Sequence, residues 1–234
     1  MALSPNRTIR MTFTTLSLTL LVHIAAGALA LLAGLVAIVT TKGGSNHLRA
    51  GTVYALSMAV VVVTAVPLAL VDENYFLFTI AVFSGYLVAA GYRALARKRP
   101  EPRVAAPVDW TLHLTMVVFG VGMLVLGVYK FLSGDSLGAV LLVFGGIGLA
   151  LAVQALWRIY RPPAERMAWL DRHITLMGGG YIATVTAAVT VNLTMVPPLA
   201  RWLGPTAVGV PAILLAITRR QRRFADGPSK AGAD

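Results

Sequence analysis

Three of the four histidines in this sequence stand in similar settings, and histidine is the side chain here best suited to hold a cofactor. The segments "DWTLHLTM" (109–116) and "WLDRHITLM" (169–177) place His113 and His173 between a tryptophan and a following threonine and methionine. His47 lies in a comparable segment, "NHLRAGTVY". Neutral imidazole ligates haem iron, and three imidazoles suit zinc, copper or non-haem iron. The pattern therefore raises the hypothesis of a redox or metal centre.

The elements that position these histidines are predicted by composition. The 234 residues are 57% hydrophobic and only 12% charged, whereas a soluble domain carries roughly a quarter charged residues. A helix that crosses the hydrocarbon core of a bilayer needs about 20 apolar residues. Seven long uncharged stretches approach or exceed that length: 11–41, 50–71, 74–92, 110–129, 136–157, 173–200 and 202–218.

We therefore predict an all-α, polytopic membrane protein with seven transmembrane helices. One transmembrane domain would cover residues 1–218, and a basic cytoplasmic tail at 219–234 is expected to be disordered. The seventh stretch is the shortest and contains Pro205 and Pro211. It is the span that the sequence supports least.

The distribution of positive charge predicts the orientation. Of the 20 lysines and arginines, sixteen fall in the first, third and fifth loops and the C-terminal tail, and four fall on the other side. The positive-inside rule then places the N-terminus outside and the C-terminus in the cytoplasm. His47, His113 and His173 would begin helices that leave the cytoplasmic side, within roughly 10 Å of one depth. His23 would lie about 25 Å along its helix from that level.

Several classes of function are disfavoured by composition. The net charge of +11 is spread over the loops between spans, so we do not expect a nucleic-acid partner. The absence of cysteine excludes disulfides, thiolate metal sites, iron–sulfur clusters and covalent c-type haem. No phosphate-binding loop, nucleophile–base pair or H-E-x-x-H motif is present.

The chain also shows internal similarity. The segment that starts at Val82 matches the segment that starts at Val143 at an offset of 61, and His113 matches His173 at an offset of 60. These matches predict that spans three-four and five-six are tandem copies of one helical hairpin. Spans one-two, with His47, would form a third copy.

The residues around the histidines allow two interpretations each. Glycines spaced along the same helix faces either permit close helix packing or clear space for a flat cofactor. Asp109 and Asp171 either cap helices or orient the neighbouring histidines. Four arginines either set the topology or bind haem propionates: Arg49, Arg97, Arg158 and Arg172.

The segments "NHLRAGTVYALSM" (46–58) and "WLDRHITLMGGGYIATVTAAVTVN" (169–192) resemble a family of bacterial polytopic membrane proteins known as domain of unknown function 2306. Its members carry a histidine in the first span, an H-R-x-x-G-x-x-Y-like segment and a late H-x-x-x-M-x-x-x-Y-x-A-x-x-T-A segment. The matching positions here are His23, then His47, Gly51 and Tyr54, then His173, Met177, Tyr181, Ala183, Thr186 and Ala187. One departure is Leu48, which stands where the family has arginine. The resemblance implies a bacterial cytoplasmic membrane protein and supports the histidine set, but it brings no established activity.

The function predicted from the sequence is that of an integral membrane redox or electron-transfer protein. The histidines on the cytoplasmic side would bind a b-type haem, with His113 and His173 as the preferred axial pair, or a metal ion through His47, His113 and His173. His23 is a further cofactor-binding candidate, and a quinone is the expected electron partner. The alternatives are a small-solute or proton-coupled transporter and an accessory subunit of a larger membrane complex.

Overall fold

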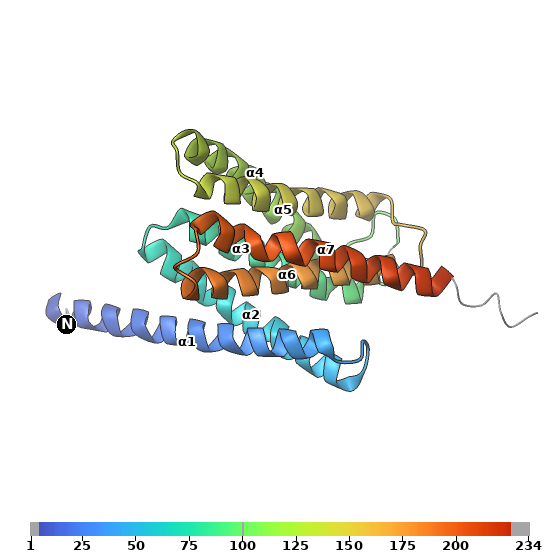
Figure 1. The fold of residues 1–234 in the computed structure, drawn as a ribbon, viewed down its shortest axis with the longest axis horizontal. Coiled ribbons are helices and arrows are strands. Elements are labelled where there is room, and N and C mark those ends of the chain that lie inside the picture. The colour runs from blue at the N-terminus through green and yellow to red at the C-terminus, as the bar shows by residue number, and fades with distance from the viewer. Residues whose placement is uncertain (1–4, 100, 226–234) are drawn as a thin grey trace, which may run out of the picture.

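The computed structural model describes residues 5–99 and 101–225, with side chains described for 16–99 and 101–222. The described chain consists of helices joined by short loops (Figure 1). Their bounds are α1 (Pro5–Val39), α2 (Ser45–Val71), α3 (Tyr75–Arg93), the short 3₁₀ helix η1 (Ala94–Ala96), α4 (Pro107–Leu132), α5 (Leu137–Tyr160), α6 (Ala168–Asn192) and α7 (Pro198–Ala225). Seven of these helices are long and apolar enough to cross a membrane, which confirms the predicted all-α class and number of spans.

Helix α7 extends further at both ends than the sequence predicted. It is continuous through Pro205 and Pro211 and ends at Ala225, so residues 219–225 of the expected disordered tail are helical. The extension has a physical cause, because Arg220 and Gln221 both donate hydrogen bonds to the carboxylate of Asp171 on α6. The rest of the predicted tail lies outside the described residues.

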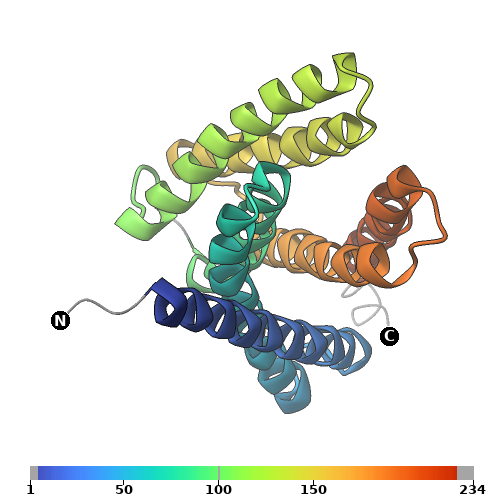
Figure 2. The same cartoon turned by 90° about the vertical axis from the view of Figure 1, so that its left-hand side faces the viewer.

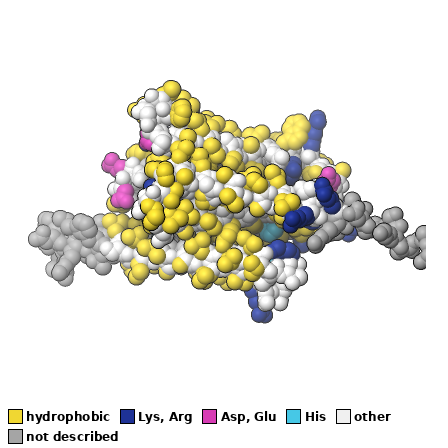
Figure 3. Space-filling view, in the orientation of Figure 1, with side chains coloured by type: hydrophobic (Ala, Val, Ile, Leu, Met, Phe, Trp, Pro, Cys, Tyr) yellow, Lys and Arg dark blue, Asp and Glu magenta, His cyan; other side chains and the backbone are white. Residues whose placement is uncertain are grey.

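The two ends of the helical bundle carry different charge. The α1–α2, α3–α4 and α5–α6 loops lie at the same end as the C-terminus of α7 (Figure 1). Lysine and arginine side chains gather at this end, which we call the basic end, and apolar side chains cover the middle (Figure 3). Asp72, Glu73 and Asp135 belong to the loops at the other end. The positive-inside rule requires such an asymmetry of charge between the two ends. The N-out, C-in orientation stays a prediction.

Helix α3 lies at the centre of the bundle. It packs against α2, α4, α5 and α6, while α1 pairs with α2, α4 with α5 and α6 with α7 (Figure 2). Within the described chain no Cα atom of α5 lies within 8 Å of a Cα atom of α6. The predicted tandem hairpins are therefore not confirmed, because α5 pairs with the helix before it.

Glycines explain that pairing. A Cβ on Gly138 of α5 would lie 2.6 Å from the carbonyl oxygen of Gly127 on α4, and one on Gly145 would lie 3.1 Å from that of Gly120. Such backbone contact is possible only where side chains are missing, as is typical of helices that associate within lipid. The close-packing interpretation holds for these four glycines.

Candidate functional site

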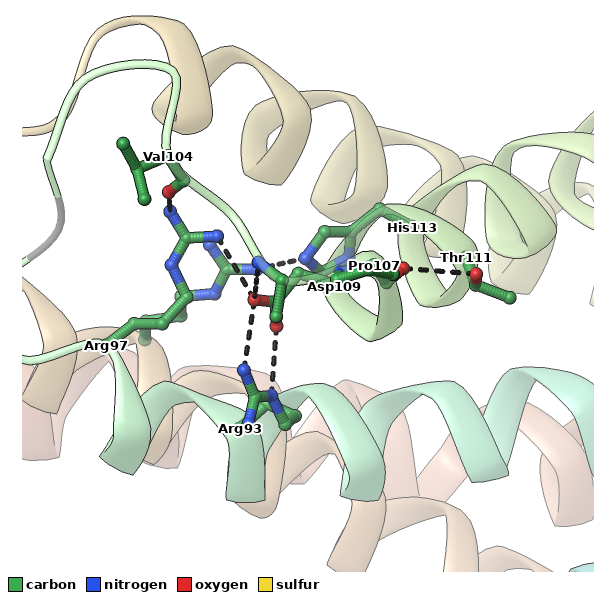
Figure 4. A network of polar contacts seen from close by, with 9 residues as sticks. Arg93, Arg97, Val104, Pro107, Asp109, Thr111 and His113 are labelled. Atoms are coloured by element: carbon green, nitrogen blue, oxygen red, sulfur yellow. Dashed lines mark hydrogen bonds and ion pairs between the residues drawn. The ribbon is translucent and has the colours of Figure 1, made fainter.

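Asp109 anchors a polar network at the basic end, where α3 and α4 meet. Its side chain is 2% exposed and receives two hydrogen bonds of 3.0 Å from Arg93, which approaches from the last turn of α3 (Figure 4). Arg97 lies 3.5 Å from the same carboxylate, and the backbone N–H of Ala106 donates to it over 3.3 Å. Asp109 therefore acts as a buried counter-ion, and none of its described hydrogen bonds involves a histidine.

His113 lies one turn further along α4, on the same face as Asp109. It is 3% exposed, and its Nε2 accepts a hydrogen bond of 3.1 Å from Arg172 on α6. Because a guanidinium can only donate, this imidazole carries its proton on Nδ1. Among the described residues no acceptor reaches that Nδ1 atom. Tyr86 packs edge-on against the ring, with 5.8 Å between the ring centres.

Arg172, on α6, is partly buried and points toward α4. Its bond to His113 is the only described hydrogen bond of this guanidinium, and no carboxylate in the described chain lies within ion-pair distance of it. Asp109 is near enough to act electrostatically, but its oxygens are bound to Arg93 and Arg97. A buried cation without a bonded anion is costly, so the positive charge of Arg172 calls for a counter-ion.

A cavity of about 620 Å³ opens beside this network and is here called the basic cavity. It extends from exposed loop residues to the buried side chains of Asp109 and His113. Three acidic side chains line it, Glu101, Asp109 and Glu165. Its seven basic side chains are Arg93, Arg97, Lys98, Arg99, Arg158, Arg166 and Arg172.

His173 and His47 form a second group of histidines, on the other side of α6. The Nδ1 atom of His173 donates to the carbonyl oxygen of Gly91 on α3 over 2.9 Å, and that of His47 donates to Ala37 on α1 over 2.9 Å. A carbonyl oxygen can only accept, so both rings carry the proton on Nδ1 and keep a lone pair on Nε2. The two imidazoles are close enough to interact electrostatically. No described hydrogen bond or ring contact joins either of them to His113.

Side chains one to three turns C-terminal to these two histidines connect α2 with α6. The hydroxyl of Tyr54 lies 3.3 Å from Thr184, and the rings of Tyr54 and Tyr181 meet edge-on at 6.1 Å. The hydroxyl of Tyr181 donates to the carbonyl oxygen of Leu31 on α1 over 3.2 Å, and its ring lies over Gly34. The two motifs that carry the family resemblance thus lie on facing surfaces.

His23 lies nearer the opposite end of the bundle. Its Nδ1 atom is 3.1 Å from the carbonyl oxygen of Val61 and 2.9 Å from the hydroxyl of Thr64, both on α2. This contact joins α1 to α2, and none of its described hydrogen bonds reaches the other three histidines. His23 has the role of an interhelical hydrogen-bond partner in this structure.

The described residues contain no group of three or more histidine or acidic side chains arranged to hold a metal ion. His47 and His173 are neighbours, whereas His113 belongs to the basic cavity. Asp171 does not orient His173 through a hydrogen bond, because its carboxylate binds Arg220 and Gln221 on α7.

The basic cavity was not predicted. The sequence showed many basic residues in the third and fifth loops, which the positive-inside rule explains without any binding site. The sequence did contain one indication of this polar network. Asp109 is a carboxylate that lies one helical turn before His113 and shortly after a loop rich in arginine.

Searches against protein-family models, curated proteins and solved structures found no match to this chain. The resemblance to domain of unknown function 2306 is thus neither supported nor contradicted. The candidate sites are defined by their geometry alone.

Proposed function

We propose that this multi-pass membrane protein transfers electrons and holds a b-type haem through His47 and His173. The observation that carries the proposal is the matched state of the two rings. Each donates its Nδ1–H to a backbone carbonyl on a neighbouring helix, over 2.9 Å in both cases. That second bond fixes the tautomer and orientation of a ligating histidine and leaves Nε2 for the iron.

The choice of haem over a bare metal ion follows from the number of ligands. Two imidazoles complete the coordination of a haem iron, because the porphyrin supplies the other four nitrogens. A zinc ion bound by the protein alone needs a third side chain, and the described residues supply no third histidine or acidic side chain that would form such a group. The pair of imidazoles therefore favours haem over a bare zinc ion.

Helices α2 and α6 contact each other through side chains. Within the described chain their Cα atoms stay more than 8 Å apart, and the hydroxyl of Tyr54 lies 3.3 Å from that of Thr184 across the gap. Bound haem would supply one-electron chemistry, and His47 and His173 would hold it through their Nε2 atoms. A quinone is the expected partner, because both histidines lie near the basic end of helices that face lipid.

The test is the visible spectrum and iron content of the purified full-length protein, both as isolated and after addition of haemin. We expect a Soret band that shifts on reduction, and its loss in His47→Ala and in His173→Ala. His23→Ala is the matched control and should keep the band, because His23 lies apart from the pair. A wild-type protein that stays colourless after haemin addition would rule out the proposal.

A further inference from the structure

The basic cavity holds more positive charge than its own side chains neutralise. Seven basic and three acidic residues line it, a formal excess of four positive charges. Asp109 is shared between Arg93 and Arg97. Its carboxylate is therefore not available to neutralise the remaining arginines.

Two arginines in this cavity have no carboxylate partner. Arg172 bonds only to the imidazole of His113, and Arg158, at the end of α5, makes no hydrogen bond or ion pair among the described residues. Both guanidinium groups line the cavity and are close enough to repel each other electrostatically. Like charges gathered at the margin of a low-dielectric bundle are destabilising unless an anion joins them.

The helices hold these arginines in place. Arg172 lies in the second turn of α6 and is tied to α4 through His113, while Arg158 belongs to the last turn of α5. With Arg93 from the last turn of α3, arginines on three different helices line one cavity, and Arg97 joins them from the α3–α4 loop. Guanidinium groups arranged in this way match the several oxygens of a phosphate, which they bind by paired, charge-assisted hydrogen bonds.

We infer that the basic cavity binds the phosphate group of an anionic ligand, with Arg172 and Arg158 as the principal contacts. The volume of about 620 Å³ is larger than inorganic phosphate requires and accommodates a phosphate ester. Basic pockets between transmembrane helices on the cytoplasmic side are typical sites for anionic lipid headgroups. The same chemistry would serve a soluble phosphate ester that enters from the aqueous side.

This site is independent of the proposed haem site. It uses His113, Arg158 and Arg172, whereas the haem proposal uses His47 and His173. An unchanged Soret band in a variant that has lost phosphate binding, or the reverse, would separate the two proposals.

The experiment measures binding to purified, delipidated full-length protein in an uncharged detergent. The probes are glycerol 3-phosphate as the soluble ester and phosphatidic acid as the lipid, with phosphatidylcholine as the lipid that lacks net charge. We expect saturable binding of a phosphate probe, measured by thermal-shift titration and by native mass spectrometry. Arg172→Gln and Arg158→Gln should each weaken it by about tenfold or more, because each removes a charge-assisted contact.

Arg161→Gln is the matched control. Arg161 is an exposed arginine three residues after Arg158, it stacks on Trp157 at 4.9 Å, and it does not line the cavity. Its substitution should leave binding within about twofold of wild type. If Arg172→Gln fails to fold, the comparison of Arg158→Gln with Arg161→Gln still decides the question.

A soluble phosphate ester and a lipid headgroup are distinguished by which probe binds. Binding of glycerol 3-phosphate, and its competition with lipid, would support a soluble ligand. Binding of phosphatidic acid alone would support a lipid headgroup. The inference is overturned if neither probe binds saturably, or if Arg161→Gln weakens binding as much as Arg158→Gln does.

Discussion

Asp109 shows how a single buried charge organises the basic end. Its carboxylate, 2% exposed, holds Arg93 by two hydrogen bonds and lies 3.5 Å from Arg97, so it ties the end of α3 and the following turn to the start of α4. Removal of one partner from such a pair leaves the other partly buried and unpaired, which costs more than the pair itself contributes. The residue is therefore a sensitive point for stability.

We predict that Asp109→Asn lowers the thermal midpoint of the purified protein by about 3–10 °C, from a loss of about 1–3 kcal/mol. The matched control is Asp135→Asn. The Lys130 ammonium, 2.7 Å away, holds the pKa of the Asp135 carboxyl below its usual value, but the Asp135 side chain is 37% exposed against 2% for Asp109, so its loss should matter less. Equal losses in the two variants would show that burial of Asp109 is not what makes it important.

The histidines illustrate what a residue type can and cannot predict. Their positions in the first two turns of α2, α4 and α6 followed from the sequence, because charged loops mark where the apolar stretches begin. Their grouping did not follow, because helical depth says nothing about which face of a helix meets which neighbour. His113 accepts a hydrogen bond from Arg172, whereas His173 lies close enough to His47 to interact with it electrostatically.

At the scale of elements, the close contact of α4 with α5 is the best-defined helix pairing. Gly138 and Gly127 bring the two backbones together, and a Cβ at position 138 would lie 2.6 Å from the Gly127 oxygen and closer still to the backbone of Phe131. Backbone atoms cannot move aside as a flexible side chain can. The contact is therefore intolerant of even one methyl group.

We predict that Gly138→Ala lowers the thermal midpoint by about 3 °C or more, through overpacking of about 1–3 kcal/mol. Gly146→Ala, on the same helix, is the control, because a Cβ there meets nothing within 4 Å. That variant should match the wild type or exceed it slightly, since alanine favours helix over glycine. A harmless Gly138→Ala would contradict the packing of α4 against α5 described above.

At the scale of the whole molecule, the segregation of charge between the two ends predicts how the protein sits in the bilayer. The basic end carries the loops α1–α2, α3–α4 and α5–α6, and the positive-inside rule assigns that end to the cytoplasm. The basic cavity and the pair His47 and His173 would then both be reached from the cytoplasmic side.

Because the chain has no cysteine, single cysteines can report this orientation without background. We predict that Ser136→Cys, in the exposed α4–α5 loop, reacts with a membrane-impermeant maleimide in intact cells. Ser45→Cys, exposed at the start of α2, should react only after permeabilisation. The opposite pattern would reverse the topology and place both candidate sites on the outer side.

The sequence by itself determined the fold class, the number of spans and the end of the bundle at which three of the histidines lie. These properties depend on local composition, because an apolar stretch of sufficient length must form a helix in lipid. The tertiary structure decided which helices pair, since that depends on whether glycines such as Gly127 and Gly138 face one another. It also decided that His113 and Arg172 are hydrogen-bonded beside a cavity, whereas His47 and His173 lie near each other outside it. The reason is that the rotation and tilt of each helix are set by its neighbours and not by its own residues.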